Sequence, residues 1–82
     1  GTEDIQQVQS GLIYPNPAYD AIRWNDSFQS LTIYDINGKV VLQNTQAFNI
    51  QSLDVRGLNS GFYMVVVKKK NTLFSQKLII ER

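Results

Sequence analysis

Short runs of alternating hydrophobic and polar residues cover most of this 82-residue chain. Alternation with a period of two places successive side chains on opposite faces of a β-strand, whereas a helix needs apolar residues three or four positions apart. We find no segment with that helical spacing and a suitable cap. The pattern therefore predicts about seven short strands, at residues 12–14, 21–24, 31–36, 39–43, 48–55, 62–68 and 72–81.

Glycine, proline and asparagine separate these segments and predict turns between them. Asn37-Gly38 lies between two β-prone runs, and both residues tolerate the positive φ angles that a type I′ hairpin turn requires. Residues 69–71 predict the second hairpin turn, between the last two strands. Pro15-Asn16-Pro17 is the densest turn signal, because proline fixes φ and lacks an amide donor. We interpret it as a bend that ends a strand, or else as a rigid, exposed recognition surface.

The number and spacing of the strands indicate an all-β domain, an immunoglobulin-like antiparallel β-sandwich at residues 11–82. Tyr63 follows Gly61 near the start of a late strand, as in a tyrosine corner, where the hydroxyl bonds to backbone just upstream. Residues 1–10 are polar and rich in glutamine, so we expect a linker there.

Segment 62–67 is apolar on both faces of its predicted strand. A two-layer sandwich buries only one face of each sheet. The second face is therefore either covered by neighbouring side chains or exposed as a docking patch. One face carries Tyr63, Val65 and Val67, and the other carries Phe62, Met64 and Val66.

Composition excludes several classes of chemistry. The chain has no cysteine and no histidine, so it builds no disulfide, thiolate nucleophile, zinc–thiolate cluster or imidazole base. We predict no enzymatic activity, no cofactor and no metal site. The net charge of +1 gives no clustered basic excess for nucleic-acid binding. The longest apolar run, residues 64–67, is too short for a transmembrane segment.

The turn motifs follow one another in an order that resembles a known family. They are Tyr14-Pro15-Asn16-Pro17-Ala18-x-Asp20, then Ile33-Tyr34-Asp35-Ile36-Asn37-Gly38-Lys39-Val40-Val41, then Leu53-Asp54-Val55-x-Gly57-Leu58-x-Ser60-Gly61-x-Tyr63, and finally Ser75-Gln76-Lys77-Leu78-Ile79-Ile80. Each motif alone is weak, and the ordered set is specific. From residue 11 onward the chain resembles the C-terminal sorting domain of proteins exported by the type IX secretion system of Bacteroidetes. Trp24 departs from the aliphatic residue usual there.

The resemblance implies a non-enzymatic export signal that follows a larger cargo protein. The implied partners are the outer-membrane translocon, a sortase-like cysteine peptidase and the N-terminal cargo domain. The cargo would cross the periplasm in transit and end at the cell surface or in the extracellular space. The peptidase usually removes the sorting domain and joins the cargo to an anionic lipopolysaccharide. The cleaved bond would lie in, or just before, residues 1–10.

The residues that match the family motifs are the predicted recognition residues for translocon and peptidase. Because the last residues matter for export in this family, the resemblance makes the final strand, residues 72–81, the expected main recognition element. If that strand lies at a sheet edge, a partner could bind by adding a strand of its own. The predicted recognition residues are Pro15, Asn16, Pro17, Asp35, Gly38, Lys39, Gly61, Tyr63, Lys77, Leu78, Ile79 and Ile80.

Two other functions remain open from the residues. The first is a carbohydrate-binding or adhesive β-sandwich module appended to a secreted enzyme. It requires exposed aromatic side chains arranged as a flat platform, and the candidates are Trp24, Tyr19 and Phe28. A buried Trp24 would count against it. The second is a structural spacer domain with no recognition role.

Overall fold

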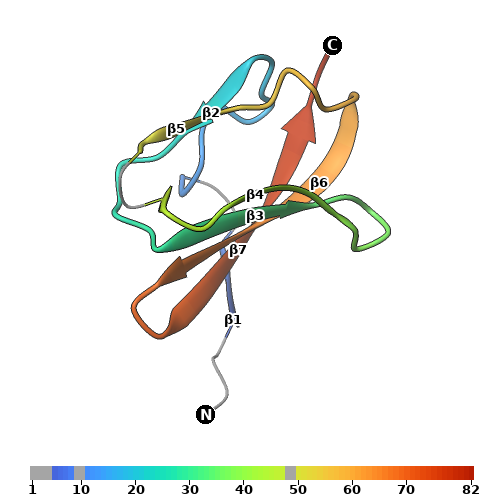
Figure 1. Cartoon of the computed structure of the whole chain (residues 1–82). Helices are drawn as coiled ribbons and strands as arrows, with labels where there is room; N and C mark the ends of the chain where they lie inside the picture. The colour runs from blue at the N-terminus through green and yellow to red at the C-terminus, as the bar shows by residue number, and fades with distance from the viewer. Residues whose placement is uncertain (1–4, 9–10, 48–49) are drawn as a thin grey trace.

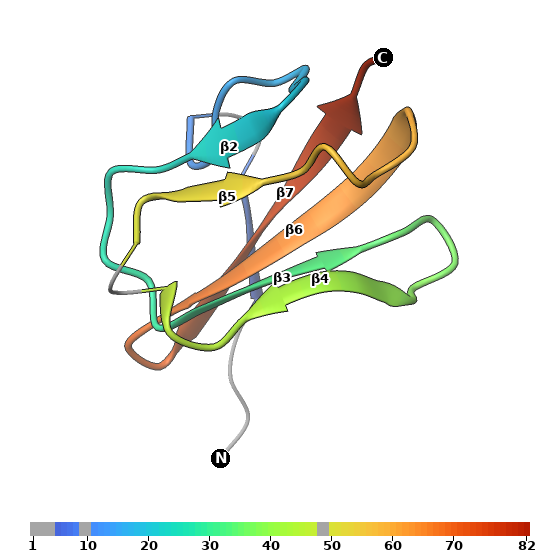
Figure 2. The same ribbon diagram turned by 45° about the horizontal axis from the view of Figure 1, so that its top comes forward.

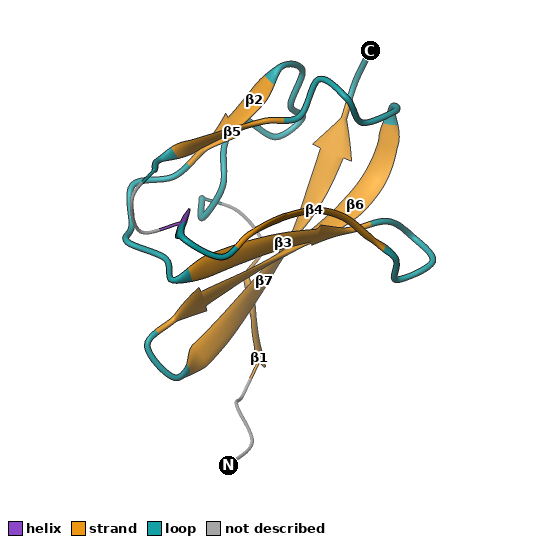
Figure 3. Ribbon diagram, viewed as in Figure 1, coloured by secondary structure: helices purple, strands orange, loops and turns teal. Residues whose placement is uncertain are grey.

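The computed structural model describes residues 5–8, 11–47 and 50–82. Apart from a short helical segment at Ala47, this described part of the chain is built from β-strands and the loops between them (Figure 3), which confirms the all-β prediction. The strands are β1 (Ile5–Val8), β2 (Ala21–Arg23), β3 (Ser30–Tyr34), β4 (Val40–Asn44), β5 (Ser52–Asp54), β6 (Gly61–Lys69) and β7 (Thr72–Ile80).

Two sheets face each other across the core (Figures 1 and 2). The larger has five strands in the order β1-β7-β6-β3-β4, and the smaller pairs β2 with β5. The pairs β2–β5, β3–β4, β3–β6 and β6–β7 are antiparallel, as expected. Strand β1 is different, because it runs parallel to β7. The predicted antiparallel domain covers residues 11–82, and β1 lies before it, in the segment expected as a linker.

The core between the sheets follows from the alternation along each strand. Inward positions of β3, β6 and β7 alternate with outward ones, so every second side chain enters the core. Removing apolar surface from water is worth about 25 cal/mol per Å², and this burial is the main force holding the two sheets together. The buried apolar residues are Ile13, Ala18, Ile22, Trp24, Phe28, Leu31, Ile33, Ala47, Val55, Val65, Val67, Leu78 and Ile80.

Strand β6 resolves the choice left open for segment 62–67. Val65 and Val67 are buried and point into the core. On the opposite face Phe62 is 53% exposed, while Met64 and Val66 are half-buried. The outer face of the larger sheet therefore presents an apolar row along β6 that starts at Phe62, near the beginning of the strand.

One predicted strand is absent, and another is shorter than expected. Residues 12–14 form bends and a single bridge between Tyr14 and Arg23. The Gln76 side chain on β7 accepts hydrogen bonds from the amides of Leu12 and Ile13, so these amides need no neighbouring strand. Predicted strand 48–55 is reduced to Ser52–Asp54 (β5), and its first two residues, 48–49, lie outside the described residues.

Both predicted hairpins are present, but the first turn has a different geometry. Gly38 has φ +82°, whereas Asn37 does not take the positive φ that a type I′ turn requires. The Gly38 amide donates to the Asp35 carbonyl at 3.0 Å, which makes a type I turn followed by a left-handed glycine. The second hairpin turns at residues 70–71, where Lys70 has φ +57°.

Candidate functional site

The predicted recognition residues fall into two groups in space. The first group gathers around the turn between β3 and β4, where that turn meets the start of β6 and the middle of β7. The second group lies along the outer edge of β7. The first comprises Asp35, Gly38, Lys39, Gly61, Tyr63 and Lys77, and the second comprises Pro15, Asn16, Pro17, Leu78, Ile79 and Ile80.

The Asp35 carboxylate shapes the turn between β3 and β4. One of its oxygens accepts hydrogen bonds from the main-chain amides of Asn37 and Lys39, each at 2.9 Å. The Asp35 amide donates to the Lys39 carbonyl at 2.9 Å and closes the hairpin. Short acidic side chains stabilise turns in this way, because they satisfy amides that the turn leaves without a partner. Asp35 is thus occupied in holding the hairpin, and Lys39 and Ile36 are presented to solvent.

Tyr63 forms the predicted tyrosine corner. Its hydroxyl donates to the Asn59 carbonyl at 2.7 Å and ties β6 to the loop just before it. Gly61 begins the strand with φ +151°, a conformation that few other residues adopt. Leu58, in the same loop, packs partly buried against the core. The prediction of a tyrosine corner is confirmed, and the role of Tyr63 there is structural.

A shallow groove of about 290 Å³ lies beside this corner on the outer face of the larger sheet. Its lining is mainly apolar, and Phe62 and Ile36 are 53% and 79% exposed. The Lys77 ammonium lies 4.4 Å from the centre of the Phe62 ring, a cation–π contact that holds both side chains over the groove. We call this the hairpin groove. It is lined by Asp35, Ile36, Phe62, Tyr63, Met64 and Lys77.

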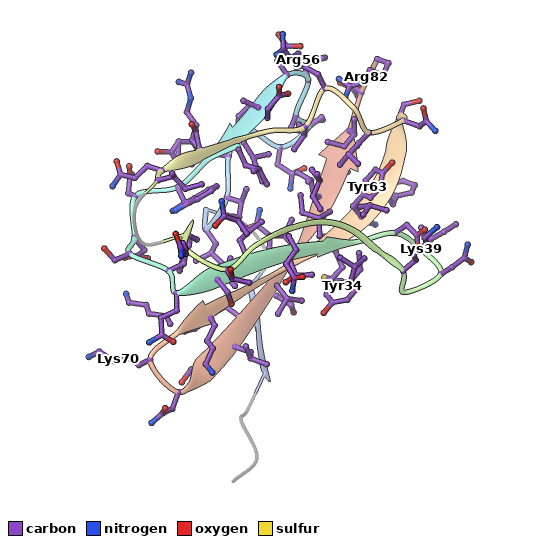
Figure 4. All side chains as sticks on the ribbon, in the orientation of Figure 1. Tyr34, Lys39, Arg56, Tyr63, Lys70 and Arg82 are labelled. Atoms are coloured by element: carbon purple, nitrogen blue, oxygen red, sulfur yellow. The ribbon has the colours of Figure 1, made fainter. Side chains whose placement is uncertain are left out.

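A second, more polar hollow of about 450 Å³ lies on the other side of Asp35 and Tyr63, and Lys39 is part of its wall. Figure 4 shows Lys39 and Tyr63 at this end of the domain, whereas Lys70 stands at the opposite hairpin tip. The two hollows share Asp35 and Tyr63 as a common ridge. Apolar surface and a lysine thus lie side by side at this end of the domain.

The second group of predicted residues closes the outer edge of β7. The Asn16 side chain donates from Nδ2 to the Lys77 carbonyl at 2.8 Å and accepts at Oδ1 from the Ile79 amide at 2.9 Å. These are the two bonds that a neighbouring strand would make, so the carboxamide replaces a strand residue. Ala18 continues the pairing, because its amide donates to the Ile79 carbonyl at 2.8 Å and its carbonyl accepts from Glu81. The Pro15-Asn16-Pro17 corner places this side chain on β7.

Strand β7 is therefore not a free edge. Residues 77–81 are bonded by Asn16 and Ala18, and Leu73 to Gln76 pair with β1. Leu78 and Ile80 are buried, so their side chains are not on the surface. The condition for simple strand addition on β7 is not met. Of the predicted residues on this strand, Lys77 is the exposed one.

Sequence reasoning missed two residues that hold this arrangement together. Gln76 is buried, its Oε1 accepts from the amides of Leu12 and Ile13, and its Nε2 donates to the Ile13 carbonyl. The Arg82 guanidinium donates to the carbonyls of Tyr19, Val55 and Leu58. The alternation offered a signal for the first, because Gln76 shares its strand face with buried Leu78 and Ile80. For the second there was no local signal.

The last residues are held at the surface as well. The Tyr19 hydroxyl donates to the Glu81 carboxylate at 2.8 Å, and this hydrogen bond raises the pKa of Tyr19. The end of β7 is thus part of the folded body rather than a loose tail.

Trp24, Phe28 and Tyr19 do not form the aromatic platform expected of a carbohydrate-binding module. Trp24 and Phe28 are 1% and 0% exposed, and their ring centres lie 6.2 Å apart inside the core. Tyr19 is exposed, but neither Trp24 nor Phe28 lies beside it at the surface. The buried Trp24 counts against this alternative function.

Comparison with known proteins identifies the family. The sequence model of the family described as "Secretion system C-terminal sorting domain" matches residues 12–81. The chain belongs to this family of sorting domains. The match covers the hairpin groove, the Asn16 corner and the whole of β7. A search of curated proteins finds no match.

Membership has direct consequences for this sorting domain. Its family serves type IX secretion as a C-terminal signal, which implies a preceding cargo, the secretion machinery as a partner, and export to the cell surface or beyond. The family is not an enzyme family. Within the described residues, helices long and apolar enough to cross a membrane are absent.

Proposed function

We propose that residues 11–82 direct a cargo protein from the periplasm through the outer membrane by binding the type IX translocon. A sortase-like cysteine peptidase then cuts in, or just before, residues 1–10 and attaches the cargo to the cell surface. The observation that carries this proposal is the family match over residues 12–81. The absence of cysteine and histidine from the chain is consistent with it, because the cutting nucleophile then belongs to the partner.

The proposal includes the fold type, an immunoglobulin-like sandwich of about seven strands. Two facing sheets and the bond from the Tyr63 hydroxyl to the Asn59 carbonyl support it. In such a sandwich, loops and strand ends cluster at either end of the two sheets, and partners commonly bind there. The hairpin groove lies at one of these ends.

Within this function the exposed side chains of the hairpin groove make the contact with the translocon. Phe62 offers apolar surface, and Lys77 adds one positive charge above it. A fitting partner therefore presents an apolar side chain beside a carboxylate. Asn16 and Ile80, in contrast, act by keeping β7 in place, because their groups are bonded or buried within the domain.

The test is a secreted reporter fused in front of residues 1–82 in a host with type IX secretion. The double variant Phe62→Ser/Lys77→Glu removes the apolar surface and reverses the charge of the groove. Lys70→Glu is the matched control, because it makes the same charge change at the opposite hairpin tip. Thermal unfolding of each purified domain verifies that the variants are folded.

We expect the wild-type and Lys70→Glu fusions to reach the cell surface, and the groove variant to remain in the periplasm. Failure of the wild-type fusion to reach the surface would contradict the proposed function itself. Surface delivery of a folded groove variant would move the recognition site elsewhere on the domain. A spacer domain predicts that no fusion changes the location of the reporter.

A further inference from the structure

Strand β1 occupies an unusual position in the larger sheet. It spans four residues, Ile5–Val8, and lies at the end of the strand order, where β7 is its neighbour among the described strands. Its register runs from Ile5 opposite Leu73 to Val8 opposite Gln76. Among the described strands it is the one that pairs in parallel. Parallel pairing is slightly less stable per residue than antiparallel pairing.

The two halves of the β7 edge are therefore closed by different means. Residues 77–81 are bonded by Asn16 and Ala18, which lie within the folded body between the core residues Ile13 and Ile22. The half from residue 73 to 76 is paired with β1. Strand β1 precedes the body in sequence, on the side where the cargo would be attached. Its displacement would leave the pairs of β7 with β6 unchanged.

We infer that residues 73–76 of β7 form a strand-receiving edge, and that an extended segment of the type IX machinery displaces β1 and pairs there parallel to β7. This inference rests on the proposed function and adds a second contact between the domain and the type IX machinery. The incoming segment needs free main-chain amides and carbonyls. Because β7 would bond to these main-chain groups, the pairing does not depend on the sequence of the segment.

The exchange replaces one ladder of main-chain hydrogen bonds with another of equal length. Such an exchange leaves no buried amide unpaired at its end, so the desolvation penalty of an open edge is avoided. The bonds of Asn16 to Lys77 and Ile79 stop the incoming strand from extending further along β7. The edge available to a partner is thus short and defined at one end.

A disulfide between β1 and β7 tests this inference. Gln7→Cys and Ser75→Cys are opposite one another in the register. Adjacent strands lie about 4.8 Å apart, within the range that a disulfide spans. The chain has no other cysteine, and the oxidising periplasm allows the bond to form. The matched control is Thr32→Cys/Gln43→Cys, which joins β3 to β4, a pair that the inference leaves intact.

A second variant, Gln6→Pro/Gln7→Pro, weakens β1. Successive amides of a strand point to opposite sides, so this change removes one donor toward β7 and one on the free side of β1. Displacement of β1 requires neither donor. If a partner instead adds to the free side of β1, the proline variant loses that contact. Each variant is fused to a cysteine-free reporter, and the redox state of the sorting domain, whether still attached or released by the peptidase, is read from its gel mobility.

We expect the disulfide between positions 7 and 75 to hold the reporter in the periplasm, at the level of a fusion without the domain. The control disulfide and the proline variant should reach the surface as the wild type does. Surface delivery of the β1–β7 disulfide in its oxidised form would overturn the inference, and so would loss of delivery by a folded proline variant. If both disulfides block export, the proline variant alone tests the inference. Its delivery to the surface at the wild-type level would then support displacement of β1. Failure of the wild-type fusion would instead contradict the proposed function.

Discussion

The buried carboxamide of Gln76 provides the sharpest test of how this domain is held together. Gln76→Met keeps the length of the side chain and removes its hydrogen bonds to Leu12 and Ile13. These bonds fix the segment that leads into the Asn16 corner. The variant therefore separates the contribution of this polar contact from that of the apolar core around it.

The expected loss of stability follows from the burial of the groups that Gln76 bonds to. The Ile13 amide and carbonyl both lose this partner, at a site where Ile13 is 1% exposed. A buried polar group without a partner costs about 1–3 kcal/mol, so we expect a loss of about 3 kcal/mol in the free energy of unfolding. For a domain of this size each kcal/mol lowers Tm by about 4–8 °C, which gives a fall of roughly 12–24 °C.

Thermal and urea unfolding, followed by circular dichroism, measure the loss. Gln43→Met is the matched control, because it makes the same change at an exposed position of β4, where the side chain has one hydrogen bond, to Thr32 at 3.3 Å. Its effect should stay within about 0.5 kcal/mol. A Gln76→Met domain as stable as the control would refute the role assigned to this side chain.

Three further changes test separate parts of the structure. Tyr63→Phe removes the hydroxyl that donates to the Asn59 carbonyl, and urea titration should show a loss of about 1 kcal/mol; an unchanged midpoint would argue against the tyrosine corner. Lys70→Gly relieves the φ of +57° at Lys70, so Tm should rise, by an amount equivalent to about 0.5–1 kcal/mol; a lower Tm would contradict the turn geometry. The Arg56 guanidinium, by its hydrogen bond, holds the pKa of Asp54 below its ordinary range. This contribution to stability is present above the ordinary pKa of an aspartate and is lost as pH falls through the lowered value, so Asp54→Asn should flatten the acid limb of the stability curve. If the acid limb of Asp54→Asn is unchanged, the Asp54 carboxylate does not make this contribution to stability.

The alternation of residues predicts the strands that face the core on one side. Strands β3, β6 and β7 were expected within one or two residues of their observed ends, because burial of one face imposes the period of two. The tyrosine corner was also predictable, because its parts lie within five residues of one another. The Asn37-Gly38 turn was placed correctly, but its type was not. The Asp35 carboxylate captures two amides and selects another turn.

Long-range contacts account for what the sequence did not predict. The pairing of β1 with β7 joins residues at opposite ends of the chain, and four residues of local pattern carry no information about such a partner. Asn16 was singled out by the resemblance, but its role as a substitute strand depends on where β7 lies. The hairpin groove combines β6, β7 and a turn, so its lining could not be read from any one segment.

The location of a reporter fused in front of residues 1–82 tests the central claim most directly. The reporter is expressed with and without the domain, in a type IX-secreting host and in the same host lacking the translocon. The account predicts that the reporter reaches the cell surface only when both the domain and the translocon are present, and otherwise stays in the periplasm. The same location in all four strains would contradict it.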